Sequence, residues 1–271
     1  MVVAAESRYP RPGPGDDGTA AGRLSGRAPT GDQTEERPMP KAFIAACLAC
    51  LVALVAAPVR AEGPVVVELF TSQGCSSCPP ADALFEDLAR DPGVVALALH
   101  VDYWDYLGWK DLFASPENTR RQKAYAHAAG EHMVYTPQIV VGGSDRTMGA
   151  RPAEVRQLID LHARLPETVR LRVSRAGDSV EIAARPAGAP VGKVVVLLMR
   201  FTPEQTVMIK RGENAGRTIR YVNIVTDMAV LTTWNGADPM EMTAPFPAGD
   251  AGAVLLQREG PGEIVAAAYV P

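Results

Sequence analysis

The chain has 271 residues, of which 47% are hydrophobic, 21% charged and 6% aromatic, a composition typical of a globular protein with a packed core. The net charge of −4 argues against a dedicated nucleic-acid binder, because phosphate contacts require an excess of basic residues. Four cysteines are too few for a small scaffold held together by many disulfides.

The N-terminal region differs in amino-acid composition from the rest of the chain. Residues 1–38 are rich in Gly and Pro and lack apolar periodicity, so we expect a disordered leader or a wrongly assigned start, with Met39 as the true start. Residues 39–61 combine one lysine, an Ala/Leu/Val-rich stretch and small residues before Ala61, which is typical of a secretory signal peptide. We therefore expect a secreted or periplasmic protein that contacts a membrane only if this segment stays uncleaved. A short transmembrane anchor and lipidation at Cys47 are the alternatives.

Residues 62–166 alternate between strand and helix patterns. Val65–Thr71 and Val94–Val101 are apolar runs that predict buried strands, and the amphipathic segment Pro79–Arg90 between them predicts a helix. A strand, a helix and a strand in such close succession form a βαβ unit with parallel strands. A helix from Ser115 to Gly130, a hairpin of Gln138–Val141 and Thr147–Ala150 and a helix over Pro152–Leu165 complete the order β-α-β-α-β-β-α.

From residue 167 onward the pattern predicts strands only. Short β-branched segments alternate with turns that contain Gly, Asn or Pro. They are Thr168–Ser174, Ser179–Ala184, Lys193–Phe201, Thr206–Lys210, Thr218–Thr226, Met228–Trp234, Ala253–Arg258 and Ile264–Val270. Regular short strands of this kind favour a β-sandwich, so we expect a second, β-rich domain at 167–271.

Cys75 and Cys78 lie between the first predicted strand and the first predicted helix, separated by two serines. A helix start lowers the pKa of a thiol, because its free N–H groups and the helix dipole favour the thiolate. This placement of a Cys-x-x-Cys pair is a thioredoxin-like signal. We expect Cys75 to be the exposed, attacking thiolate and Cys78 to resolve the mixed disulfide. A structural disulfide and a metal site are the alternatives.

The order of elements, the cysteine pair and Tyr135-Thr136-Pro137 before the third strand resemble the thioredoxin fold. More closely, the segments 68–82, 100–105, 134–138 and 211–216 resemble a secreted, thioredoxin-like bacterial family of unknown function, of the DUF1223 type. The resemblance implies a cis peptide bond before Pro137, which would lie against the cysteine pair, and a Thr136–Pro137 backbone that is presented to an extended substrate. It implies no settled activity. Gly74 and the two serines depart from thioredoxin itself.

Aromatic residues gather after the second predicted strand, with Tyr103, Trp104 and Trp109 as the candidates for substrate binding. The carboxyl ends of the two parallel strands and the start of the antiparallel third strand meet at one edge of the sheet, where a ligand crevice is expected. These aromatics would then form a binding wall beside the cysteine pair. The alternative is that they pack an inserted segment onto the core.

Glu68 is a carboxylate inside the apolar first strand. Burial there would raise its pKa, and the group would accept the proton of Cys78. Exposure to water and an ion pair with an arginine are the alternatives.

A basic hairpin surrounds the glycine-containing turn at 212–216. Its cations are Lys210, Arg211, Arg217 and Arg220. The hairpin is either a solvated turn or a loop that reaches the edge of the active site.

The residues together favour a thiol–disulfide oxidoreductase that acts on a protein thiol substrate or redox partner and needs no cofactor besides its own cysteine pair. A copper(I)-binding or metallochaperone module is the alternative, with Cys75, Cys78 and His132 as ligands, because thiolates prefer soft ions. A third possibility is a non-catalytic binding protein with a structural disulfide. No nucleic-acid partner is expected.

Overall fold

The structure, a computed structural model, describes residues 63–271. These residues belong to one compact unit of the chain, residues 60–271. The leader expected at 1–38 and the signal peptide expected at 39–61 lie outside the described residues. Between residues 63 and 271, no helix has both the length and the hydrophobicity needed to cross a membrane.

The first half of the described chain follows the predicted order of strands and helices. The elements are β1 (Val65–Thr71), α2 (Pro79–Leu88), β2 (Val94–His100), a short 3-10 helix (Asp105–Leu107), α3 (Pro116–Ala128), β3 (Gln138–Val141), β4 (Asp145–Met148) and α4 (Pro152–Ala163). Each of these α-helices has a proline in its first turn, where no intrahelical hydrogen bond is lost. Ser115 caps α3 by accepting a hydrogen bond from the Glu117 N–H.

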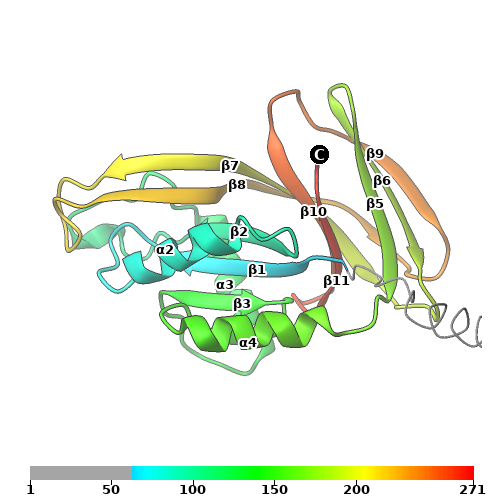
Figure 1. Cartoon of the computed structure of the whole chain (residues 1–271), viewed down its shortest axis with the longest axis horizontal. Helices are drawn as coiled ribbons and strands as arrows, with labels where there is room; N and C mark the ends of the chain where they lie inside the picture. Colours follow the sequence, from blue (N-terminus) through cyan, green and yellow to red (C-terminus); the bar gives the residue numbers. More distant parts are fainter. Residues whose placement is uncertain (1–62) are drawn as a thin grey trace, which may run out of the picture. The chain divides into compact units, whose positions relative to one another are not determined.

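The strand pairing brings three segments to one edge of the sheet. β1 pairs parallel with β2, which places Thr71 opposite His100 at their carboxyl ends. β3 runs antiparallel to β1, with Gln138 opposite Phe70. The turn before α2, the segment after β2 and the segment before β3 therefore meet at this edge (Figure 1).

The strands after residue 167 extend the same sheet. They are β5 (Val169–Ala176), β6 (Ser179–Pro186), β7 (Val194–Met208), β8 (Thr218–Trp234), β9 (Met240–Pro245), β10 (Ala251–Arg258) and β11 (Ile264–Tyr269). β8 pairs with β2, which gives an eight-stranded sheet of order β11-β10-β7-β8-β2-β1-β3-β4. β5, β6 and β9 form a separate three-stranded sheet. The protein is a mixed, sheet-dominated α/β fold with few helices.

The boundary expected at residue 166 does not divide the main sheet. Every residue of β2 is buried, so its second edge also needs a strand beside it, and β8 fills that place. β8 is one strand where two were expected, and β7 extends through most of the strand expected at Thr206–Lys210. Strand propensity does not specify which strands become neighbours, and for that reason the sequence suggested a separate domain.

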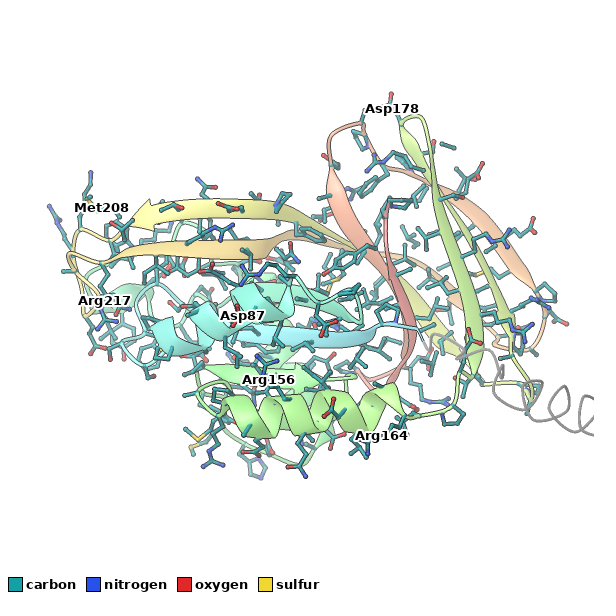
Figure 2. The ribbon with its side chains drawn as sticks, viewed as in Figure 1. Asp87, Arg156, Arg164, Asp178, Met208 and Arg217 are labelled. Atoms are coloured by element: carbon teal, nitrogen blue, oxygen red, sulfur yellow. A yellow bond between two sulfur atoms is a disulfide. The ribbon has the colours of Figure 1, made fainter. Side chains whose placement is uncertain are left out.

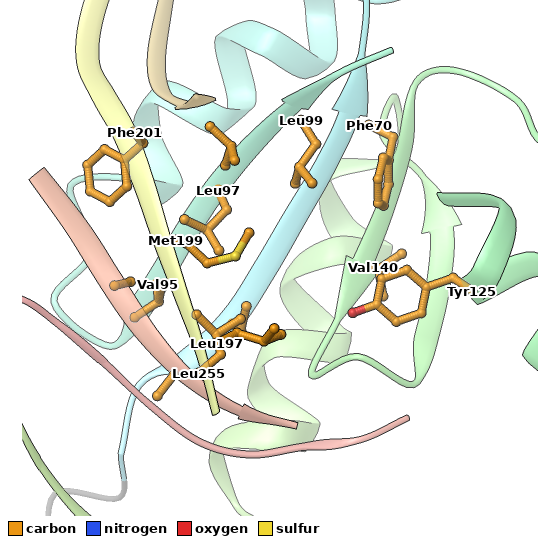
Figure 3. Close-up of a cluster of buried hydrophobic side chains, with 14 of the residues drawn as sticks. Phe70, Val95, Leu97, Leu99, Tyr125, Val140, Leu197, Met199, Phe201 and Leu255 are labelled. Atoms are coloured by element: carbon orange, nitrogen blue, oxygen red, sulfur yellow. The ribbon is translucent and has the colours of Figure 1, made fainter. Parts of the chain in front are cut away.

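Apolar side chains cover both faces of β1. Val67 and Leu69 pack with residues of α2 and α4, whereas Val66 and Phe70 belong to the cluster that contains Tyr125 of α3. Figure 3 shows this second cluster, which continues through Leu97, Met199 and Leu255 of neighbouring strands. Because side chains alternate along a strand, the face of a β1 residue decides whether it lies on the side of α2, the helix that follows the cysteine pair.

Candidate active site

A disulfide joins Cys75 and Cys78 in the turn between β1 and α2, with their Cα atoms 5.4 Å apart. Cys78 is the N-cap residue of α2, and its carbonyl accepts hydrogen bonds from the N–H groups of Ala81 and Asp82. The Cys78 N–H donates to the Cys75 carbonyl over 3.2 Å. The pair therefore lies at a helix N-terminus, the position that favours a thiolate after reduction.

Both cysteines are buried in the oxidised protein. Cys75 is 3% exposed and Cys78 is fully buried, whereas Ser76 and Ser77 between them are exposed. The expectation of an exposed Cys75 is therefore wrong for the disulfide form, because segments distant in sequence cover the turn. Of the two cysteines, only Cys75 retains any solvent-accessible surface.

Thr136 and Pro137 lie beside the cysteine turn, and the peptide bond between them is cis, as the resemblance implied. The Ser77 hydroxyl donates to the Thr136 carbonyl oxygen over 3.5 Å and lies 3.3 Å from the Cys75 sulfur. Gly149 permits this packing, because a Cβ there would lie 3.0 Å from the Pro137 Cβ. Presentation of this backbone to a substrate stays a prediction.

The aromatic side chains predicted to bind substrate form hydrogen bonds with other parts of the protein. Trp104 donates from Nε1 to the Thr136 hydroxyl over 2.7 Å, and Trp109 donates from Nε1 to Gln73 Oε1 over 2.8 Å. Tyr103 donates to a glutamine of α3, and burial raises the pKa of this tyrosine to about 12. The polar atoms of the three rings are thus bound internally, so the rings brace the cysteine turn and its surroundings.

Glu68, the expected proton acceptor, lies on the opposite face of the sheet from α2. Its carboxylate accepts hydrogen bonds from Arg121 of α3 at 2.5 and 3.1 Å and from the Tyr125 hydroxyl at 2.5 Å. Both side chains of the ion pair are buried. The alternation along β1 keeps Glu68 away from Cys78, so the expected role at that cysteine is not supported. Glu68 instead fixes α3 to the sheet.

Asp82 is the buried carboxyl group on the side of Cys78. It follows Cys78 by four residues, so both lie on the same face of α2. Its Oδ1 accepts a hydrogen bond from the Thr71 hydroxyl over 2.7 Å, whereas Oδ2 has no hydrogen-bond partner within residues 63–271. Burial raises the pKa of Asp82 from 3.8 to about 7, although His100 and the Thr71 hydroxyl act to lower it. The sequence signal for Asp82 was its spacing of one helical turn from Cys78.

A second buried pair, His100 and Asp111, adjoins Asp82. His100 Nδ1 lies 2.7 Å from Asp111 Oδ2, and the same oxygen accepts from the Gln73 N–H in the cysteine turn over 2.8 Å. The rings of His100 and Tyr221 are 4.9 Å apart, and burial raises the pKa of Tyr221. His100 Nε2 and the Tyr221 hydroxyl lack partners in the described part of the chain. The cysteine turn is therefore bound to Asp111, which in turn contacts His100 of β2.

The loop between β7 and β8 reaches the cysteine turn. The basic hairpin is therefore not only a solvated turn, because its loop contacts this edge of the sheet. The buried Asn214 donates from Nδ2 to the carbonyl oxygens of Gln73 at 3.0 Å and Cys75 at 2.8 Å. Gly212 has a φ of +76°, and a Cβ there would lie 3.1 Å from the Trp109 Cβ. Glycine therefore permits both the turn and the close approach. Asn214 was not singled out from the sequence, although it lies between the turn glycines.

The three residues expected as copper ligands are not brought together. His132 is exposed in the segment between α3 and β3. Across residues 63–271, no group of three or more His, Cys, Asp and Glu side chains is arranged to hold a metal ion. A copper(I) site would therefore rest on the reduced Cys75 and Cys78 alone.

These features define a mixed α/β protein with a Cys-x-x-Cys disulfide at the start of a helix. The chain belongs to the family described as a protein of unknown function (DUF1223), whose model matches residues 66–257, which confirms the family expected from the sequence. It is also similar to the crystal structure of protein AGR_C_4864 from Agrobacterium tumefaciens, with 40% sequence identity, a TM-score of 0.68 and coverage of 77% of this chain and 94% of that chain. No curated protein matches the sequence.

Proposed function

We propose that this protein is a thiol–disulfide oxidoreductase that exchanges its Cys75–Cys78 disulfide with cysteine pairs of other proteins. The observation that carries the proposal is the place of the disulfide, at the start of α2 with the cis Thr136–Pro137 segment beside it. On this proposal, residues 62–166 are a thioredoxin-like domain to which 167–271 add a sandwich-like, β-rich part. The signal-like segment 39–61 supports action in a secreted or periplasmic setting, where disulfides persist.

Exchange begins when a substrate thiolate attacks Sγ of Cys75. A bond forms between the two sulfurs, the Cys75–Cys78 bond breaks, and Cys78 leaves as a thiolate that takes up a proton. A second substrate thiolate then attacks the substrate sulfur of the mixed disulfide and releases Cys75. Two electrons have moved, because the substrate dithiol has become a disulfide and the protein disulfide has become two thiols. The same steps in reverse reduce a substrate disulfide.

Asp82 is the group suited to exchange a proton with Cys78. A carboxyl group with a pKa of about 7 is partly protonated near neutral pH, which is the state a general acid or base requires. Its burial keeps bulk water from competing for the proton, and it shares a helix face with Cys78. This is the role that the sequence had suggested for Glu68.

The decisive measurement is the reduction potential of the pair. The protein should carry Cys47→Ser and Cys50→Ser, so that no other thiol reacts, and should be equilibrated with glutathione buffers. A potential between roughly −120 and −270 mV is expected, because working oxidoreductases fall in that range. A potential below about −300 mV would identify a structural disulfide and refute the proposal.

A trapping experiment tests the separate roles of the two cysteines. In the Cys78→Ser protein, Cys75 should form a mixed disulfide with a cysteine-containing protein substrate that persists, because the resolving thiol is missing. Cys75→Ser is the matched control and should trap nothing through Cys78, which is buried. Thiol exchange that survives in the Cys75→Ser protein would contradict the assignment.

A further inference from the structure

We propose that the loop between β7 and β8 selects substrates in which acidic side chains flank the reacting cysteine. The proposal rests on the exchange reaction at Cys75 and names the substrate class of that site. The loop, residues 209–217, will be called the basic loop. Its cations are Lys210, Arg211 and Arg217.

The basic loop is held in a fixed place against the disulfide. The Gly216 N–H donates to the Ile209 carbonyl over 2.8 Å, and the Ile209 N–H donates to the Arg217 carbonyl over 2.9 Å, so the loop is closed on itself. Asn214 then ties the closed loop to the Cys75 carbonyl. Because a backbone oxygen of the reacting cysteine is one of the attachment points, the charges of the loop stay close to the disulfide.

The three cations of the basic loop are available to a partner. Each is exposed, and none takes part in an ion pair within residues 63–271. Arg220, at the base of the same hairpin, differs because it pairs with Glu86 and Glu204. Arg220 is therefore not one of the unpaired cations of the basic loop. Figure 2 shows Arg217 at the end of the β7–β8 hairpin, near Met208.

The basic loop is positively charged, whereas the whole chain is negatively charged. The basic loop has three cations and one acidic residue, Glu213, in a chain with a net charge of −4. Lys110 adds an exposed cation next to Trp109, the residue on which Gly212 packs. A cluster of positive charges near a reactive site attracts negatively charged substrates. Such electrostatic attraction raises association rates by roughly ten- to a thousandfold.

Exposed apolar side chains on the same segments indicate a polypeptide rather than a small thiol. Met208, which immediately precedes the basic loop, is 61% exposed, and Tyr106 and Leu112 in the segment after β2 are 78% and 67% exposed. Such side chains offer contacts for apolar residues of a bound chain. The favoured occupant is therefore a polypeptide with acidic residues next to its cysteine.

Two cysteine peptides of equal length test the proposal, one with glutamates and one with glutamines beside the cysteine. The rate at which each peptide reduces the Cys75–Cys78 disulfide is measured at low and at high salt. Each rate is divided by that of the same peptide with an uncharged disulfide reagent, which removes the effect of the glutamates on the thiol pKa. The glutamate peptide should react about tenfold faster at low salt, and the preference should vanish at high salt, where exposed charges are screened.

A triple variant assigns the preference to the loop. Lys210→Ser, Arg211→Ser and Arg217→Ser together should abolish it. The control triple variant, Arg156→Ser, Arg164→Ser and Arg185→Ser, removes the same charge from exposed positions on α4, at its C-cap and on β6, and should retain the preference. Figure 2 shows Arg156 on α4 and Arg164 at the C-terminal end of that helix, apart from Arg217. If the loop triple variant melts at a lower temperature, Arg217→Ser alone replaces it and should reduce the preference in part.

The outcomes separate the two proposals. If neither peptide reduces the disulfide of the wild type, the exchange reaction itself is refuted. If both peptides react at equal corrected rates, the exchange reaction stands and the selection of acidic substrates is overturned. An equal loss of preference in both triple variants also overturns it, because the effect would then come from the net charge of the protein.

Discussion

Replacing Asp82 with asparagine should stabilise the oxidised protein above neutral pH and leave its stability almost unchanged in acid. The folded protein holds the Asp82 proton up to about pH 7, because burial raises the pKa. The unfolded chain releases the proton near the ordinary value of 3.8. Between these two values the folded state binds more protons than the unfolded state. The stabilisation is complete below the lower value and is lost as the pH rises through the upper one.

The size of the effect follows from the two pKa values. Each pH unit between them changes the free energy of unfolding by about 1.4 kcal/mol. The wild type should therefore lose about 4 kcal/mol through this group between acidic and weakly alkaline pH. Asparagine carries no charge at any pH and keeps the oxygen that accepts from the Thr71 hydroxyl, so Asp82→Asn escapes this loss.

Urea denaturation at about pH 4 and about pH 8 measures the difference. The advantage of Asp82→Asn over the wild type should be near zero at the lower pH and close to about 4 kcal/mol at the higher one. Asp87→Asn is the matched control, because Asp87 is an exposed carboxylate on the same helix (Figure 2). An advantage of equal size at both pH values, or a less stable variant at the higher pH, would refute the reasoning.

Three further substitutions test the contacts around the site. Arg121→Met should cost about 3–5 kcal/mol in denaturant unfolding, because it leaves a buried carboxylate unpaired, whereas Arg120→Met in an exposed ion pair should cost under about 1 kcal/mol. Asn214→Ala should lower the free energy of unfolding by about 1–3 kcal/mol, because the buried Gln73 carbonyl loses its donor and the Cys75 carbonyl loses one of its two donors. Glu213→Ala, at an exposed position of the same loop, should change it little. Gly149→Ala should lower the melting temperature and cost about 1–3 kcal/mol, because its methyl group would collide with neighbouring Cβ atoms. A stable Gly149→Ala protein would contradict the close packing at that edge.

Local patterns were sufficient to predict the elements around the cysteine pair. The apolar run at Val65–Thr71, the amphipathic helix after it and the second apolar run were each predicted within a few residues of their observed bounds. This success has a physical cause, because side-chain periodicity and proline or glycine at the ends act over a single element. The position of Cys78 at the start of α2 followed directly.

The buried partners of the site were not predictable in the same way. Glu68 and Asp82 are both buried carboxyl groups, and the sequence favoured Glu68 for a role at Cys78, although Glu68 lies on the face of the sheet opposite α2. The choice depends on which face of the sheet α2 and α3 cover, and that is set by packing between distant elements. The Cys75 carbonyl likewise accepts a hydrogen bond from Asn214, which lies 139 residues further along the chain.

Local patterns predicted the order of strands and helices up to residue 166, the cysteine pair at a helix start and the proline beside it, because these depend on residues close together in the chain. Packing between distant elements decided that β8 pairs with β2, that one sheet continues past residue 166, that Asp82 is buried and that the basic loop is tied to the cysteine turn. Burial favours arrangements in which buried strand edges and most buried polar groups find hydrogen-bond partners. In the linear sequence, several segments could serve as the neighbour of a given strand or buried polar group. Only the packed structure shows which one does.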